Sequence, residues 1–272
     1  MADRRAIGIF DSGLGGLTVV SEIVKLLPNE NIVYFGDTGR VPYGTRSRET
    51  IVKYARQDEK FLLGKDVKLI VAACGTVSSV ASDTANELPV PFVEVVSHSV
   101  KSAVSVTKNK KIGILATSAT ISSKSHKTQI KRLLPDCEVI ESSGTLLVPL
   151  VEEGWTSDSD SVVCETVRRY LEPMIKAQVD TVILGCTHFP VLTKVISKVM
   201  GEGVTLVNMG TATAFAVKEC LEKGDALNDS KQKGTHKYFV SDKTASFEKT
   251  ASVLLNEKID GKAVEQVDIN SL

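Results

Sequence analysis

The sequence predicts an α/β protein with two similar lobes, each built on a mainly parallel sheet that is flanked by helices. Three observations lead to this prediction. Short apolar runs rich in Val and Ile alternate with longer segments of helical periodicity, a pattern typical of strand–helix–strand units. The same order of runs occurs twice along the chain. The length of 272 residues suits one large or two medium α/β domains.

The first part of the chain contains four predicted strands separated by helices. Each strand run is short and apolar on both faces, as expected in a parallel sheet covered on both sides. The helices end at Pro28, Gly64 and Pro89, which are recognised helix stops. The predicted strands are Ala6–Phe10, Ile32–Phe35, Val67–Ala73 and Phe92–Val96, and the helices between them are Leu14–Leu27, Ser47–Leu63 and Thr76–Leu88.

The next part of the chain repeats this pattern roughly 110 residues later. The run KIGILA at Lys111–Ala116 matches AIGIFD at the first strand, and TVILGCT at Thr181–Thr187 matches IVAACGT at Ile70–Thr76. Glu138–Ser142 and Val204–Asn208 match the two remaining strands. Four matches in the same order predict two lobes related by a pseudo-twofold axis, with the active site between them.

The end of the chain is predicted to extend the first lobe rather than to form a third domain. The polar stretch Gly224–Lys237 is expected to be a linker or exposed loop. Two candidate strands, Tyr238–Ser241 and Ala263–Ile269, lie on either side of a candidate helix at Ala245–Leu255. We therefore expect a first lobe of residues 1–98 plus 208–272 and a second lobe of residues 99–207.

The composition excludes several classes of protein. Hydrophobic residues make up 42% of the chain and charged residues 24%, which is too apolar for a disordered chain. The 33 Lys and Arg residues balance the 33 Asp and Glu residues, so no nucleic-acid partner is expected. No apolar run approaches about 18 residues and no signal peptide precedes the first strand, so we expect a cytoplasmic protein with no membrane partner.

The five cysteines have spacings that fit neither a zinc site nor a disulfide framework, and no metal is expected. Two of them, Cys74 and Cys186, end matching strands of the two lobes, and each is predicted to open a helix. Ligands of open parallel sheets bind at this edge, and a helix N-terminus stabilises a thiolate. Two thiols that face each other across a cleft are suited to removing a proton from one face of a carbon and delivering another to the opposite face. Asp11 and His188, one near each cysteine, are the candidate polar groups that would set the protonation states of the two thiols.

The glycine-rich run at 11–18 also admits a dinucleotide-binding hypothesis. Gly13 and Gly15 follow a strand, and Asp37 closes the next strand. However, Thr18 occupies the position of the third glycine of that motif. A nicotinamide site would also leave both cysteine segments unexplained.

Five segments together resemble the glutamate racemases, cofactor-independent enzymes of the aspartate/glutamate racemase superfamily. These are DSGLGGLTV (11–19), GDTGRVPYG (36–44), AACGTVSS (72–79), VPLVEEG (148–154) and LGCTHFPVL (184–192). The resemblance implies two-base interconversion of L- and D-glutamate without a cofactor, supply of D-glutamate for peptidoglycan, and a homodimer.

The resemblance also implies roles for individual residues. It makes Cys74 and Cys186 the bases, with Asp11, Glu152 and His188 as their polar assistants. Substrate contacts are expected at Asp11, Ser12, Tyr43, Gly44, Gly75, Thr76, Thr187 and His188. Structural roles are expected for the remaining candidates: Asp37 in a turn, Cys137, Cys164 and Cys220 in packing, and His98, His126 and His236 at the surface or as core residues with satisfied hydrogen bonds.

Three departures from the family pattern leave other hypotheses open. Gly75 replaces a substrate-binding Asn, Asn208 replaces an Asp, and the segment Phe92–Ser99 lacks the usual Gly and Pro. A Gly75→Asn substitution is expected to raise kcat/KM by about tenfold or more, unless Gly75 makes room for another group. The alternatives are a two-thiol racemase for aspartate or another acidic substrate, and a weakly active binding protein of racemase descent.

Overall fold

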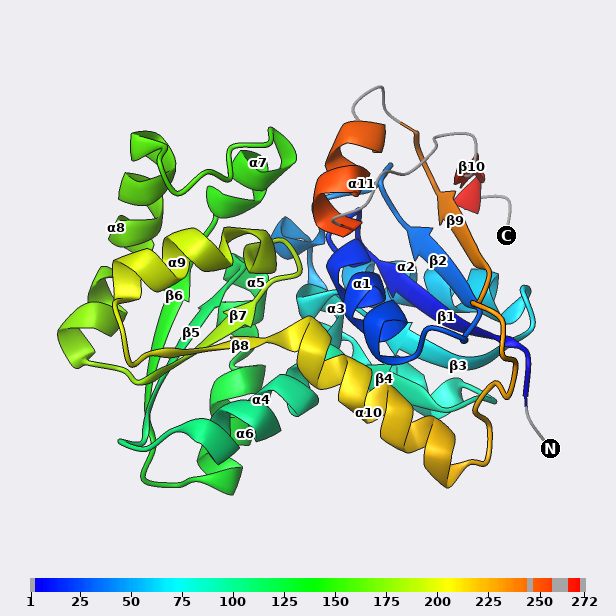
Figure 1. The fold of residues 1–272 in the computed structure, drawn as a ribbon, viewed down its shortest axis with the longest axis horizontal. Coiled ribbons are helices and arrows are strands. Elements are labelled where there is room, and N and C mark those ends of the chain that lie inside the picture. The colour runs from blue at the N-terminus through cyan, green and yellow to red at the C-terminus, as the bar shows by residue number, and fades with distance from the viewer. Residues whose placement is uncertain (1–2, 244–246, 256–263, 270–272) are drawn as a thin grey trace.

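The computed structural model describes residues 3–243, 247–255 and 264–269. It contains two parallel sheets side by side, each flanked by helices (Figure 1). The predicted fold class, two α/β lobes with parallel sheets, is therefore confirmed.

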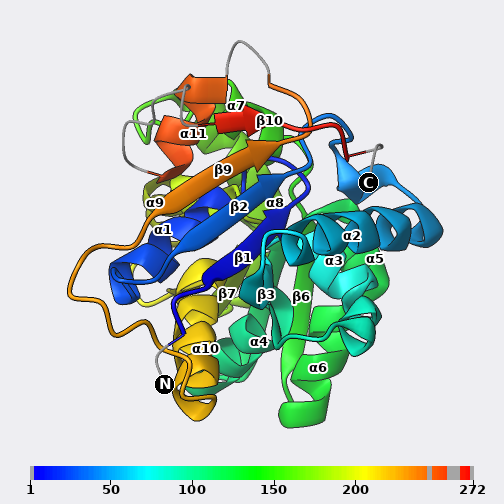
Figure 2. The same ribbon diagram turned by 90° about the vertical axis from the view of Figure 1, so that its right-hand side faces the viewer.

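The sheet of the first lobe has the strand order β10-β9-β2-β1-β3-β4, and every neighbouring pair is parallel. Figure 2 shows β9, β2, β1 and β3 side by side in this order. Side chains of β1 point alternately to the two faces of the sheet, so that Ile7 and Ile9 pack in one apolar cluster and Phe10 in another. The strands are β1 (Ala6–Asp11), β2 (Ile32–Gly36), β3 (Val67–Ala72), β4 (Phe92–Glu94), β9 (His236–Val240) and β10 (Val264–Gln266).

The sheet of the second lobe has the order β6-β5-β7-β8, again with parallel neighbours. Its strands are β5 (Lys111–Ala116), β6 (Glu138–Ser143), β7 (Thr181–Gly185) and β8 (Thr205–Asn208). This order repeats β2-β1-β3-β4 of the first sheet, so the internal repeat is present in three dimensions. We propose lobe boundaries near residues 98 and 208, where the chain passes from one sheet to the other.

Helices cover the sheets and join the lobes. Helix α10, which follows β8 of the second sheet, packs on α1 and α4 (Figure 1). The α-helices are α1 (Leu17–Leu26), α2 (Arg48–Leu63), α3 (Gly75–Val80), α4 (Val95–Val106), α5 (Ser118–Ser123), α6 (Ser125–Leu133), α7 (Leu147–Glu152), α8 (Ser161–Ala177), α9 (Thr193–Met200), α10 (Met209–Lys223) and α11 (Phe247–Leu255). The 3₁₀ segments are η1 (Tyr43–Thr45), η2 (Ser82–Glu87) and η3 (Phe189–Leu192). Within the described ranges, no helix is both long and apolar enough to cross a membrane.

Several element boundaries differ from the prediction, and three of the differences have a clear local cause. The first helix begins at Leu17 rather than Leu14, because the preceding residues form the glycine-rich turn. Strand β4 ends at Glu94, whose carboxylate accepts hydrogen bonds from the first backbone N–H groups of α4 and so starts that helix. The helix predicted at 76–88 is interrupted at Ala81, where the Thr84 hydroxyl donates to the Ala81 carbonyl and favours a local turn.

The C-terminal predictions are only partly covered by the described residues. Helix α11 is described from Phe247, so Ala245 at the predicted start lies outside those residues. The last strand is Val264–Gln266, and Ala263 at its predicted start also lies outside them.

His126 differs from the expected surface or satisfied core residue. Its side chain on α6 is buried, and neither ring nitrogen has a hydrogen-bond partner among the described residues. Burial lowers the pKa of His126 from 6.5 to about 4. The unfolded chain therefore binds more protons than the folded protein between these two pH values, and stability falls as the pH drops through that range.

Because His126 binds a proton more readily in the unfolded chain, we expect it to lower the free energy of unfolding of the wild-type protein by about 3 kcal/mol between pH 7 and pH 4. In a His126→Leu variant, this part of the decrease in the free energy of unfolding should be absent. Urea unfolding of both proteins at pH 7 and pH 4 measures the difference, and other titrating groups cancel in the comparison. An equal acid loss in the two proteins would contradict the prediction.

Candidate active site

The carboxyl ends of the two sheets lie close together between the lobes. The Thr18 hydroxyl of the first lobe donates to the Thr187 carbonyl of the second at 2.8 Å, and the Thr76 and Thr117 hydroxyls are 3.2 Å apart. A Cβ atom at Gly15 would collide with Thr187 and His188. Close contact between loops thus accounts for the glycine at position 15, and the dinucleotide-binding hypothesis is not needed to explain it.

Cys74 lies at the end of β3, and its backbone begins α3. Its side chain is buried, with the sulfur 3.5 Å from the Ser12 hydroxyl oxygen. Burial, with a further contribution from the charge of Asp11, raises the pKa of the Cys74 thiol to about 12. Cys74 is therefore protonated at neutral pH in this closed arrangement and is suited to donate a proton.

Asp11 lies at the end of β1 and is 1% exposed. Its Oδ2 accepts a hydrogen bond of 3.0 Å from the backbone N–H of Gly13, but Oδ1 has no partner among the described residues. Burial raises the pKa of Asp11, and the charge of His188 opposes that rise. A buried carboxylate oxygen without a donor is costly, so Oδ1 is a strong candidate acceptor for a cationic group of a ligand.

In the second lobe, two successive side-chain contacts link Cys186 to His188 and His188 to Glu152. The Cys186 sulfur is 3.8 Å from His188 Nδ1, and His188 Nε2 is 3.1 Å from Glu152 Oε1. Burial disfavours the charged imidazole, but the contacts with Cys186 and Glu152 outweigh it and raise the pKa of His188 to about 10. His188 is thus an imidazolium at neutral pH, placed where it can exchange a proton with Cys186 or balance its thiolate.

The prediction that Cys186 opens a helix directly is wrong. A turn follows Cys186, and the next element is the short 3₁₀ segment η3. The Pro190 ring and the turn at Thr187–His188 delay regular α-helix until α9 begins at Thr193. This turn is what aims the His188 ring back at the Cys186 sulfur.

The segment Tyr43–Thr45 brings the first lobe against the second. A Cβ atom at Gly44 would lie 3.3 Å from Thr117, at the start of α5. The Tyr43 hydroxyl, however, bonds to Asp37 and Asp58. The Tyr43 hydroxyl is therefore engaged within the first lobe, which leaves only the backbone of Tyr43 for the expected contact with substrate. Sequence reasoning missed Asp58, because one carboxylate inside an amphipathic helix carries no local signal of such a contact.

Gly75 lies at a close contact between the two lobes. A Cβ atom at this position would lie 2.7 Å from the backbone carbonyl oxygen of Gly185 and 3.5 Å from the Met209 methyl carbon. Because the nearest atom is backbone at the end of β7, the contact cannot be relieved by rotating a side chain. The structure therefore reverses the expected sign of the Gly75→Asn substitution and favours the alternative in which glycine makes room.

We expect Gly75→Ala and Gly75→Asn each to lower kcat/KM, by about tenfold, because overpacking moves the Cys74 loop away from Gly185. Gly75→Ala measures the effect of a Cβ atom alone, and its difference from Gly75→Asn measures the effect of the added amide group. Steady-state kinetics of the three proteins provide the measurement. A higher kcat/KM in the Asn variant than in the wild type would contradict this prediction.

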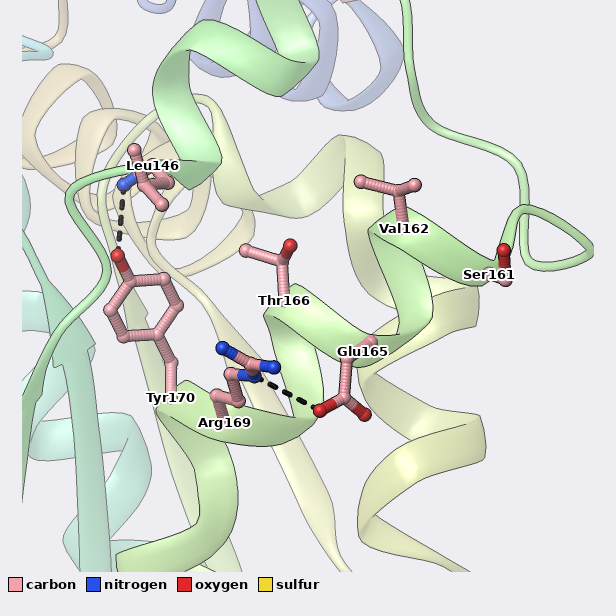
Figure 3. A pocket seen from close by; sticks show the side chains of 7 residues that line it. All are labelled: Leu146, Ser161, Val162, Glu165, Thr166, Arg169 and Tyr170. Atoms are coloured by element: carbon pink, nitrogen blue, oxygen red, sulfur yellow. Dashed lines mark hydrogen bonds and ion pairs between the residues drawn. The ribbon is translucent and has the colours of Figure 1, made fainter.

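The two thiols are closed off from solvent in this structure. Cys74 is 4% and Cys186 6% exposed, so a substrate reaches them only when the surrounding loops or lobes move apart. A surface pocket of about 750 Å³ lies between Leu146 and α8 and contains none of the expected site residues (Figure 3). No cluster of His, Cys, Asp or Glu within the described ranges could hold a metal ion.

Each lobe contributes a buried thiol at the end of a central strand, with a titratable neighbour: the charge of Asp11 acts on Cys74, and His188 lies 3.8 Å from Cys186. Such a fold and such side chains are suited to an enzyme that moves protons at a site between α/β lobes. The chain belongs to the Asp/Glu/hydantoin racemase family, whose model matches residues 7–217. It is 44% identical to a glutamate racemase from Geobacter metallireducens over 94% of both chains.

Solved structures agree with this assignment. The fold matches a glutamate racemase from Francisella tularensis in complex with D-glutamate, with a TM-score of 0.91 and 33% identity over 99% of this chain and 100% of that one. It also matches a glutamate racemase from Thermus thermophilus in complex with β-chloro-D-alanine, with a TM-score of 0.88 and 36% identity over the full length of both.

Proposed function

We propose that the protein is a glutamate racemase that interconverts L- and D-glutamate by proton transfer at the α-carbon. The pairing of Cys74 with Asp11 and of Cys186 with His188, at equivalent strand ends of the two lobes, carries this proposal. Similarity to glutamate racemases over nearly the whole chain supports glutamate as the substrate.

In each direction one cysteine acts as base and the other as acid. The thiolate of one removes the α-proton and becomes a thiol, while the thiol of the other donates a proton to the opposite face of the carbon and becomes a thiolate. No atom is gained or lost overall, and the two cysteines exchange protonation states. The reverse reaction starts from the state that the forward reaction leaves, so both groups are needed in both directions.

The neighbouring polar groups set the charges around the reacting carbon. Asp11 Oδ1, buried and without a donor among the described residues, would accept a hydrogen bond from the substrate ammonium group. His188 would exchange a proton with Cys186, and Glu152 fixes the orientation of the imidazole through Nε2. The substrate carboxylates would lie among the hydroxyl and backbone groups of Ser12, Tyr43, Gly44, Thr76 and Thr187, beside Gly75.

The wider role follows from the same resemblance. We infer that the enzyme works in the cytoplasm as a homodimer, needs no cofactor, and supplies D-glutamate for peptidoglycan. These inferences rest on the family motifs rather than on a contact in the described residues.

The test is incubation of the purified protein with L-glutamate, and separately with L-aspartate, in deuterated water without added cofactor. We expect deuterium at the α-carbon together with optical inversion for glutamate. Inversion of aspartate alone would make the protein a racemase for the shorter acid. The absence of both exchange and inversion with either substrate would indicate a binding protein.

A further inference from the structure

A cluster of buried polar side chains lies behind the loop that carries Tyr43 and Gly44. Arg40 donates from Nε to Asp37 Oδ2 at 2.6 Å and from Nη2 to Asp58 Oδ1 at 3.2 Å. The Tyr43 hydroxyl donates to Asp37 Oδ2, and the same hydroxyl oxygen is 3.1 Å from Asp58 Oδ2. Asp37 and Asp58 are both 0% exposed. Two carboxyl groups, both shielded from solvent, therefore share one phenol and one guanidinium.

The positions of the protons follow from these contacts. Tyr43 has a single hydroxyl proton, and its short contact with Asp37 uses that proton. The remaining contact, between the Tyr43 oxygen and Asp58 Oδ2, is attractive only if Asp58 supplies a proton of its own. With Asp58 neutral, the charges of Asp37 and Arg40 balance, and every donor in the series has an acceptor.

The electrostatic surroundings agree with this assignment. Burial is the main cause that raises the pKa of Asp58 well above its ordinary value, and the charges of Asp37 and Glu59 add to it. Arg40 and the hydrogen bond with Tyr43 act in the opposite direction without cancelling the rise.

We propose that Asp58 is a positioning residue that stays protonated and, through Tyr43, holds the Tyr43–Thr45 segment against Thr117 of the second lobe. The order of donors is Asp58 to Tyr43 to Asp37, and Ser241 completes it by donating to Asp37 Oδ1 at 2.7 Å. Thr117 in turn contacts Thr76, two residues beyond Cys74. A displaced Tyr43–Thr45 segment would thus alter the edge of the cleft where substrate carboxylates are expected.

The kinetic test rests on the proposed racemase function and uses three substitutions in the full-length enzyme. Asp58→Leu, which cannot hydrogen-bond, should raise KM for glutamate by about tenfold and change kcat by less than about threefold. Asp58→Asn should restore KM to within about threefold of wild type, because a neutral amide can donate to Tyr43 and accept from Arg40. Glu59→Gln is the matched control: Glu59 neighbours Asp58 on α2 but accepts from Thr84, and its KM should not change.

Two KM results would overturn the proposal on Asp58. A KM in Asp58→Asn as high as in Asp58→Leu would overturn the proposal, since it would show that the carboxylate charge is required. If Asp58→Leu does not fold, Tyr43→Phe removes the same hydrogen bonds while keeping the ring, and an unchanged KM in that variant would also overturn it.

A second measurement does not depend on activity. The infrared difference spectrum of wild type minus Asp58→Asn at neutral pH should contain the C=O stretch of a protonated carboxylic acid. A carboxylate band in its place would overturn the proposal even in an active racemase. Conversely, a wild-type protein inactive toward glutamate would refute the proposed function and leave the infrared result on Asp58 valid.

Discussion

Cys74→Ala and Cys186→Ala should each nearly abolish racemisation. General acid–base catalysis contributes about 10²- to 10⁴-fold, and each variant loses one of the two groups that must act in every turnover. The remaining thiol can still abstract the α-proton from the enantiomer that it faces and return a solvent proton to the same face. We therefore expect each variant to exchange hydrogen with only one enantiomer, and the two variants to differ in which one.

Polarimetry and proton NMR in deuterated water measure inversion and exchange separately. Cys164→Ala is the control, because Cys164 is a half-buried residue of the second lobe that packs against its core and should leave activity unchanged. Equal and small losses with both enantiomers in both cysteine variants would exclude the thiols as the bases.

His188→Asn and Asp11→Asn should have the second largest effect, about tenfold or more on turnover in one direction. The pKa of His188 is raised to about 10, so the wild-type ring keeps its proton through neutral pH and loses it only as the pH rises through that value. A limb of the pH–rate profile near pH 10 should therefore be present in the wild type and absent in His188→Asn. In Asp11→Asn the neutral side chain no longer attracts the substrate ammonium group, so KM should also rise.

The kinetic comparison must treat kcat and KM separately for each direction, because no variant can change the equilibrium between the enantiomers. His98→Asn is the control for the histidine, since His98 lies on α4 outside the site. Profiles that keep their wild-type shape in both His188→Asn and Asp11→Asn would remove these side chains from the mechanism.

Much of the fold and the strand-end residues of the candidate site could be predicted from local sequence patterns. The apolar runs that form β1, β3, β5 and β7 are short, rich in branched residues and followed by polar residues, and buried parallel strands require this pattern wherever they occur. Because parallel strands end at one edge of a sheet, the sequence alone is enough to assign Cys74 and Cys186 equivalent positions in the two lobes.

Element boundaries depend on side chains that a periodicity does not describe. Glu94 ends β4 because its carboxylate caps α4. The sequence pattern predicted a helix directly after Cys186, but a turn follows this residue and the helix begins later. Such boundaries are decided by single hydrogen bonds or single residues, whereas periodicity averages over a whole segment.

The contacts that decide the chemistry come only from the tertiary structure. The pKa of Cys74 follows from its burial and from the charge of Asp11, and the pKa of His188 from its contacts with Cys186 and Glu152. The restriction at Gly75 comes from a carbonyl of the opposite sheet. The same holds for Asp58, an unremarkable helical carboxylate until α2 places it beside Tyr43. The sequence by itself determined which strands form and which polar residues end them, because both are local properties. Tertiary packing within each lobe decided the pKa values of these residues, and packing between the lobes decided the space at Gly75, because desolvation and steric contact depend on atoms that are distant in the chain.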